Sequence, residues 1–337
     1  MGPFRKRRAA SGPHPITAFW TWWADEGHSI DPSQTSRTTD ELTRRVAAIH
    51  PDLAWHFGPG ETSQHRLTVS AGGVAELRPA AERWLRAGPS ADAMWEFRSS
   101  QQADPDALSN VLEIAGHKID LASTKFRVEP VEEELRVYVG VHHPDFGQLP
   151  EQARAQITFL VLDWLLGEDD VERWLGHIEP LSSTPEPAAS AGDVVAAVAK
   201  MAAERDPDEW VILQWEDEQG LPGLVTTRRG LRWVDHPTLD HHQIVSAAYP
   251  AQENGLPSDA ESLDDLREIE SELESLLGSR GILVAYETHR GVRTFHAYTD
   301  GEDQNIDAAI NDWASGRHFS VDSQPDPAWS QVRHFTG

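Results

Sequence analysis

The stretch from residue 281 to residue 300 constrains the fold more than any other part of the chain. Its sequence, GILVAYETHRGVRTFHAYTD, contains two runs rich in strand-forming residues, 282–286 and 292–298. His289-Arg290-Gly291 separates the runs and supplies the turn, because glycine adopts positive φ without strain. The pattern predicts a β-hairpin, and the uninterrupted apolar run 282–286 predicts that its first strand is well buried.

Helical periodicity flanks this hairpin. The segment 263–277 has apolar residues that recur on one face, and Gly278 is positioned to end the helix; the predicted buried seam consists of Leu263, Leu266, Ile269, Leu273 and Leu276. Ser262 with Asp265 predicts a capping box at the start of this helix. The elements expected in the second half are helix 193–204, strands 209–215, 223–227 and 242–249, helix 263–277, the hairpin, helix 306–314 and strand 319–323.

The first half of the chain has a similar order of elements, although it contains one additional helix. We therefore expect an α+β fold made of two ferredoxin-like, split βαβ modules, each with a mainly antiparallel sheet and helices on one face. The elements expected in the first half are helices 16–26, 38–49, 74–87, 106–118 and 151–167, and strands 53–57, 65–71, 94–99, 124–129, 135–141 and 174–181.

Composition divides the chain into segments. Residues 1–15 carry the cluster FRKRR and two prolines, which predicts a basic flexible tail. The segment 182–192, SSTPEPAASAG, has no apolar period and is expected to be a linker. The sequence thus predicts an N-terminal α+β domain over residues 16–181 and a C-terminal ferredoxin-like domain over residues 193–337.

The chain is strongly acidic, with 55 Asp and Glu against 29 Lys and Arg and a net charge of −26. Such a charge repels nucleic acid and anionic membranes and favours basic partners. There is no cysteine, which excludes disulfides, thiolate catalysis and cysteine-based zinc sites. No apolar run is long enough for a membrane span, so we expect a cytoplasmic protein that does not insert into membranes.

Familiar catalytic and nucleotide-binding motifs are absent, including G-x-S-x-G, G-x-x-x-x-G-K-[ST], G-x-G-x-x-G and H-E-x-x-H. The sequences His142-His143-x-Asp145 and Asp240-His241-His242 resemble metal-binding clusters, but each lacks a visible third ligand. We expect solvated loop histidines there, and assign no catalytic residue, metal ligand or cofactor. Trp20, Trp22 and Trp23 are expected in the core, with a sugar-binding platform as the alternative.

The most suggestive surface feature is acidic. Glu261, Asp265, Glu268 and Glu272 recur at spacings of four, three and four, which places them on one helix face opposite the apolar seam. Like charges at these spacings destabilise a helix by about 0.2–0.5 kcal/mol per pair. Either the stripe is a solvated face, or it is a docking surface for a basic protein. A second acidic spot is expected at a hairpin tip, formed by Glu216, Asp217 and Glu218.

Several stretches resemble the bacterial family of unknown function DUF695. They are the opening Phe19-Trp20-x-Trp22, the runs HPDLAWHFGPG, RLTVSAGG and GPSADAMWEFR, and the C-terminal hairpin followed by DPAW (326–329). The resemblance covers most of the chain, departs from the family at Trp23 and in the basic tail, and implies no substrate, cofactor or catalytic residue. By strand order and acidity, the second half is also similar to the ribonuclease E activity regulator B family.

These features predict a non-catalytic protein that interacts with, inhibits or regulates a basic partner through its acidic helix faces. The alternative is a metal-dependent hydrolase with its site between the two modules and the histidine pairs as candidates.

Overall fold

The computed structural model describes residues 13–32 and 37–336. The chain forms two compact units, residues 1–100 (unit 1) and 101–337 (unit 2). Both contain helices and sheets, and most strand pairs of the chain are antiparallel, as expected of an α+β protein. A basic tail was predicted for residues 1–15, and residues 1–12 of it lie outside the described residues.

Unit 1 packs three helices against a small sheet of order β1-β2-β3, in which β1 and β2 are antiparallel and β2 and β3 are parallel. Its core is mostly aromatic. Phe19 makes edge contacts with Trp20 and Trp84, at ring-centroid distances of 5.0 and 5.5 Å. The elements are α1 (Pro15–Asp25), α2 (Arg37–Ile49), β1 (Ala54–Pro59), β2 (His65–Ser70), α3 (Arg78–Arg86) and β3 (Trp95–Arg98).

The tryptophans at the start of the chain belong to this core. Trp20, Trp22 and Trp23 are 8%, 6% and 3% exposed. Trp20 stacks on Trp84 and donates its indole N–H to the Trp84 carbonyl at 2.8 Å. Burial of all three rings confirms the expected core position, and the alternative of a sugar-binding platform is wrong.

The first part of unit 2 contains a hairpin, β4–β5, and a sheet of order β6-β7-β8 covered by helices. The helix predicted over residues 106–118 is wrong. Ala115 and Gly116 have φ of 53° and 78°, which bends the chain into the hairpin instead. The elements are β4 (Val111–Ile114), β5 (His117–Asp120), β6 (Lys125–Val131), β7 (Arg136–His142), α4 (Glu151–Leu166), α5 (Glu168–Trp174), β8 (Leu175–Pro180) and α6 (Ala191–Glu204).

The predicted linker, residues 182–192, lies inside unit 2. Ala189 exchanges two backbone hydrogen bonds with Phe126 of β6, at 2.8 and 3.0 Å. The helix that follows, α6, buries Val194 and Val198 in the same hydrophobic core as β6 and β7. The division between the compact units therefore falls at Ser100 rather than at this segment.

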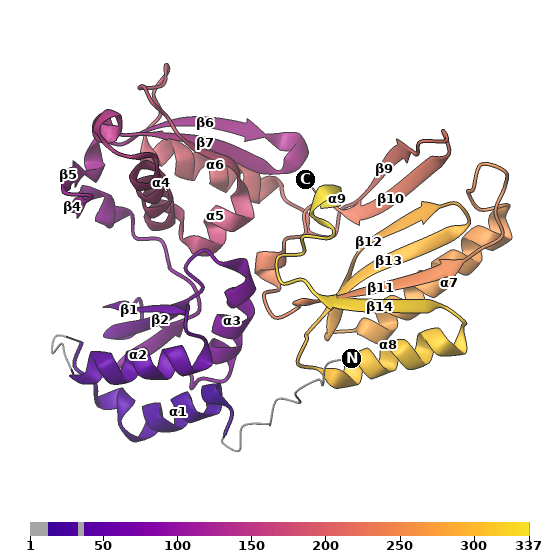
Figure 1. Ribbon diagram of the computed structural model, residues 1–337, viewed down its shortest axis with the longest axis horizontal. Coiled ribbons are helices and arrows are strands. Elements are labelled where there is room, and N and C mark those ends of the chain that lie inside the picture. Colours follow the sequence, from indigo (N-terminus) through magenta and orange to yellow (C-terminus); the bar gives the residue numbers. More distant parts are fainter. Residues whose placement is uncertain (1–12, 33–36, 337) are drawn as a thin grey trace, which may run out of the picture. The chain divides into compact units, whose positions relative to one another are not determined.

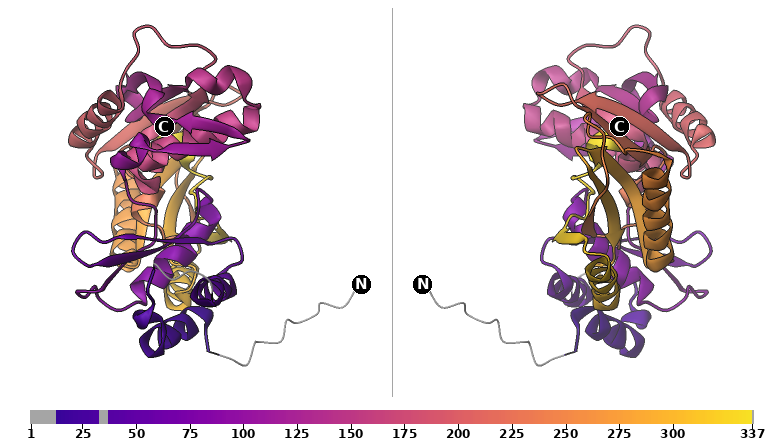
Figure 2. Two further views of the ribbon diagram at one scale, coloured as in Figure 1. Left: turned by 90° about the vertical axis from the view of Figure 1, so that its left-hand side faces the viewer. Right: turned by 90° about the vertical axis from the view of Figure 1, so that its right-hand side faces the viewer.

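The second part of unit 2 is a six-stranded antiparallel sheet of order β14-β11-β13-β12-β10-β9. Its central strands, β12 and β13, form the predicted hairpin, and Arg290 and Gly291 take φ of 49° and 77° in its turn. Helix α7, orange in Figures 1 and 2, lies along the sheet. The elements are β9 (Trp210–Glu216), β10 (Pro222–Arg228), β11 (His241–Ala248), α7 (Ala260–Leu277), β12 (Gly281–His289), β13 (Val292–Thr299), α8 (Gln304–Gly316), β14 (Ser320–Pro325) and α9 (Arg333–Thr336).

The two halves of the chain do not repeat one topology. The strands expected to form a single sheet in the first half are divided, since β3 lies in unit 1 while β6, β7 and β8 lie in unit 2. In addition, β2–β3 and β7–β8 are parallel pairs, whereas every pair in the six-stranded sheet is antiparallel. The ferredoxin-like module predicted for the first half of the chain is therefore not found among the described residues.

A buried arginine joins the two parts of unit 2. Arg232, 4% exposed, donates through Nη2 to the carbonyls of Glu134 and Leu135 at 3.0 and 3.5 Å. Through Nη1 it donates to the carbonyls of Arg229 and Leu231 at 3.0 and 3.2 Å. Burial, with Arg136 and Arg205 nearby, lowers the pKa of Arg232 to about 9. One guanidinium thus satisfies carbonyls on both sides of this junction.

Asp163 of α4 gives unit 2 a pH dependence. Burial, with Glu168 nearby, raises its pKa from 3.8 to about 7. The folded chain therefore retains this proton between about pH 4 and pH 7 while the unfolded chain loses it, and stability falls as the pH rises through that window. We expect Asp163→Asn to raise the free energy of unfolding at pH 8 by up to about 4 kcal/mol.

Denaturant titrations of the wild type and the Asp163→Asn variant at pH 8 and pH 4 check this prediction. The advantage of the variant should disappear at pH 4, where Asp163 is protonated in the folded wild type. An equal advantage at both pH values would show that the substitution acts through packing rather than through charge.

Candidate functional site

Helix α7 presents the acidic face predicted from the sequence. Its apolar seam, which includes Leu266, Ile269 and Leu273, packs on the sheet, so the opposite face points to solvent. Leu263, predicted to belong to the buried seam, is 39% exposed. The helix begins earlier than predicted, because the side chain of Asp259 accepts the Ser262 N–H at 2.9 Å and acts as the N-cap. The predicted capping box is therefore wrong, whereas Gly278 does end the helix, with φ of 51°.

The four predicted stripe residues do not share one environment. Glu261, Asp265 and Glu268 are exposed. Glu272 is partly buried, forms an ion pair with Arg317, and accepts the Trp313 indole N–H at 3.0 Å. Three residues of the stripe are thus presented to solvent, while the fourth ties α7 to α8. The acidic residues of α7 are Glu261, Asp264, Asp265, Glu268, Glu270, Glu272 and Glu274, against a single basic residue, Arg267.

A groove borders this acidic face between α7 and α8. It has a volume of about 630 Å³, and its open surface is mostly apolar. Trp313 of α8 and Leu276 of α7 supply the apolar part, and Glu268 and Glu272 supply the acidic rim. The groove thus places an apolar floor beside several negative charges. The lining residues are Glu268, Ser271, Glu272, Ser275, Leu276, Trp313 and Arg317.

In the acidic spot at the tip of the β9–β10 hairpin, Asp217 stabilises the local structure. Asp217 accepts the N–H groups of Gln219 and Leu221 at 2.8 and 2.9 Å and pairs with Arg290 and His289. These contacts, the Leu221 N–H above all, lower the pKa of Asp217 well below its usual range. Asp217 therefore fixes the turn against the neighbouring hairpin. Glu216 and Glu218 are exposed on either side of it.

The histidine pairs are not solvated, which corrects the expectation for His142, His143 and His242. His143, 1% exposed, contacts the Asp120 carbonyl through Nε2 at 2.8 Å and accepts the Asp145 N–H through Nδ1. His142 Nδ1 lies 3.2 Å from the Leu181 carbonyl. Both rings thus serve the backbone. Within the described ranges, no group of three or more His, Asp or Glu side chains is placed to hold a metal ion.

The sequence did not predict the partner of His242. His242 Nε2 lies 3.1 Å from His296 Nδ1, and His296 Nε2 lies 3.0 Å from a Glu287 carboxylate oxygen. Burial, with His296 next to it, lowers the pKa of His242 to about 4. The His296 hydrogen bond lowers the pKa of Glu287. These groups form a polar chain on the sheet face opposite α7, because His296 alternates with the core residues Phe295 and Ala297.

The C-terminal segment covers this polar chain. Tyr298 stacks on His242 and Trp329, at ring-centroid distances of 4.7 and 4.6 Å, and donates its hydroxyl to Asp326 at 2.7 Å. Phe335 lies against His296 at 5.7 Å. Burial, together with Asp326, raises the pKa of Tyr298 above its usual range. This polar chain of side chains is therefore part of the packed interior of the second part of unit 2. Alternating polar residues on β13 were the only signal for it in the sequence.

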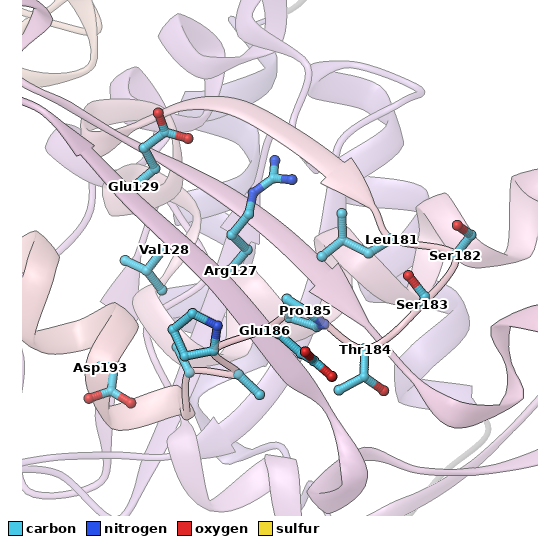
Figure 3. A pocket seen from close by; sticks show the side chains of 13 residues that line it. Arg127, Val128, Glu129, Leu181, Ser182, Ser183, Thr184, Pro185, Glu186 and Asp193 are labelled. Carbon is cyan, nitrogen blue, oxygen red and sulfur yellow. The ribbon is translucent and has the colours of Figure 1, made fainter.

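A second hollow lies under the segment 182–189 and measures about 810 Å³ (Figure 3). Two of its charged groups are already engaged. Arg127 pairs with Glu179 at 2.5 Å, and Asp193 accepts the N–H of Ser190 at 2.8 Å as part of the α6 capping box. It brings together no free acid and base, so it is a weaker candidate than the groove beside α7.

The groove lies in the part of the chain that matches a known protein family. Residues 216–335 match the model of a family described as of unknown function, DUF695. The matched DUF695 region contains β10 to β14, α7 and α8, and therefore the acidic face and its groove. It supports the resemblance noted in the sequence for the C-terminal part only, and the similarity to the ribonuclease E regulators stays a prediction.

Neither a curated protein nor a solved structure matches the chain. No helix in the described part of the chain has the length and apolar character needed to cross a membrane.

Proposed function

We propose that this protein is a non-catalytic interaction protein that binds a basic partner on the α7 face. One observation carries the proposal: three acidic side chains of α7, Glu261, Asp265 and Glu268, are exposed, and the last of them lines a groove whose floor is apolar. We also infer that β11 to β14 with α7 and α8 form a split βαβ, ferredoxin-like module. The strand order β14-β11-β13-β12 and its antiparallel neighbours support this.

The two features of the face have different roles in binding. The acidic residues of α7 attract a basic partner over distances of about 10 Å and raise the association rate. The apolar floor of Trp313 and Leu276 offers the area that an apolar anchor buries, and such burial accounts for most of the lifetime of a complex. The partner is therefore an amphipathic basic segment, of which a helix that lies in the groove is the simplest form.

Binding of a designed peptide tests this proposal. The probe is a lysine-rich amphipathic helix with leucines on one face, titrated calorimetrically into the full-length protein. We expect the triple variant Glu261→Lys/Asp265→Lys/Glu268→Lys to bind the peptide at least about tenfold more weakly, because the partner would meet like charges. These three side chains are exposed, so folding should be retained.

The matched control reverses three exposed acids elsewhere in unit 2, Glu113→Lys/Glu129→Lys/Glu133→Lys. It changes the net charge by the same amount and should retain most of the affinity. Equal weakening in both variants would mean that the peptide senses only the net charge, and the proposal would fail. Unchanged binding in both variants would also contradict it.

A further inference from the structure

The outermost strand of the six-stranded sheet, β9, has an open edge. It pairs with β10 on one side, and within residues 13–32 and 37–336 no strand is hydrogen-bonded to its other side. Figure 1 shows β9 and β10 at one end of the sheet. Natural proteins usually protect such an edge with charges, proline or a covering element, because it is a template for another strand.

The backbone groups on the open edge can be assigned from two hydrogen bonds. In an antiparallel pair, alternate residues direct both N–H and C=O to the neighbouring strand. The Asp217 N–H donates to the Leu221 carbonyl at 3.0 Å, and the Arg229 N–H donates to the Glu209 carbonyl at 3.1 Å. The odd-numbered residues of β9 therefore face β10. The outward-facing backbone groups belong to Trp210, Ile212, Gln214 and Glu216.

Apolar side chains are exposed along the same strand. Ile212, Leu213 and Trp215 are 65%, 41% and 39% exposed. Ile212 lies on one face of the sheet, whereas Leu213 and Trp215 lie on the other. Trp215 is held in place, since its ring lies 4.6 Å from that of His289. An incoming strand would thus find backbone partners at the edge and apolar surface on both sides of it.

The charges at the ends of β9 determine which kind of strand can pair with its open edge. Asp208 and Glu209 precede the strand, and Glu216 and Glu218 lie at its end, all of them exposed. Antiparallel pairing of two copies through this edge would bring the acidic ends of one copy against those of the other, in chains that each carry a net charge of −26. The edge therefore favours a strand with an apolar centre and basic ends over a second copy of this chain.

We propose that β9 is a docking site for an extended peptide segment with an apolar centre and basic flanks, which joins the sheet as an additional strand. The backbone of Ile212 and Gln214 supplies the central hydrogen bonds, and the acidic ends set the register. This site is separate from the α7 face, and its existence does not depend on the function proposed there.

A designed peptide of alternating valine and threonine residues with a lysine pair at each end is the probe. We expect it to bind the full-length protein, and the same peptide with glutamate pairs to bind at least about tenfold more weakly. Gln214→Pro should weaken binding of the lysine peptide at least about tenfold, since proline removes an outward N–H at a position that an edge strand tolerates.

Two controls separate this proposal from general loss of structure and from the α7 site. Gln214→Thr keeps the N–H and should bind as the wild type does, and so should Glu261→Lys/Asp265→Lys/Glu268→Lys. Binding that survives Gln214→Pro, or that does not distinguish the two peptides, would overturn the proposal. A wild-type dimer in sedimentation experiments that Gln214→Pro converts to monomers would overturn it as well, because the edge would then hold a second copy.

Discussion

Replacing Trp84 by alanine should lower the free energy of unfolding of unit 1 by about 3–5 kcal/mol. Trp84 is fully buried, and its ring contacts those of Phe19, Trp20 and Phe97 at 5.5, 4.9 and 6.2 Å. Alanine would leave a cavity at the centre of this aromatic cluster that rigid neighbouring rings fill poorly. Hydrogen exchange of the β2 amides in the full-length protein locates the loss in unit 1.

Trp84→Phe is the control for this prediction. The Trp84 indole N–H has no hydrogen-bond partner among the described residues, so phenylalanine removes no hydrogen bond there. It keeps an aromatic ring in the cluster, and we expect it to cost less than half as much stability as alanine. If the two variants were equally destabilised, the loss would not come from the cavity.

Replacing Arg232 by methionine should lower the free energy of unfolding of unit 2 by about 3 kcal/mol or more. Methionine keeps a long side chain but leaves four buried or partly buried carbonyl contacts without their donor, two of them at Glu134 and Leu135. The effect should appear as faster hydrogen exchange in residues 131–136 and 229–235, because these segments meet at the guanidinium.

Arg267→Met is the comparison variant. Arg267 is exposed on α7 and pairs with Asp264 at 2.9 Å. Exposed ion pairs contribute about 0–1 kcal/mol, so its loss should be nearly neutral. A similar small effect for Arg232→Met would show that water replaces the guanidinium at the carbonyls and that this arginine does not hold the two parts of unit 2 together.

Local patterns predicted the C-terminal half well. The hairpin was visible because Arg290 and Gly291 interrupt two β-rich runs, and α7 was visible because Leu266, Ile269 and Leu273 recur at helical spacing. Both signals depend on residues close together in the chain. The prediction of a helix over residues 106–118 was wrong for the same reason. Its apolar residues also suit the short strands β4 and β5, and the Ala115-Gly116 turn decides in favour of the strands.

Contacts between distant residues could not be predicted in this way. Glu272 belonged to the predicted stripe, yet it is held by Arg317, which follows α8 in the sequence. His242 looked like half of a metal cluster, but its partner is His296 on the neighbouring strand. The grouping of strands into sheets could not be predicted for the same reason, because local patterns indicate the order of the strands along the chain but not which strands pair.

The chemical shift of the Trp313 indole N–H tests the binding role of the α7 face most directly. This group lies in the groove and donates to Glu272, so a basic amphipathic helix that occupies the groove must change its surroundings. The account predicts that titration with the lysine-rich helix shifts the Trp313 signal and the amides of Glu268 and Leu276, and that Glu261→Lys/Asp265→Lys/Glu268→Lys abolishes these shifts. Binding of the helix that leaves Trp313 unchanged and shifts residues elsewhere would contradict it.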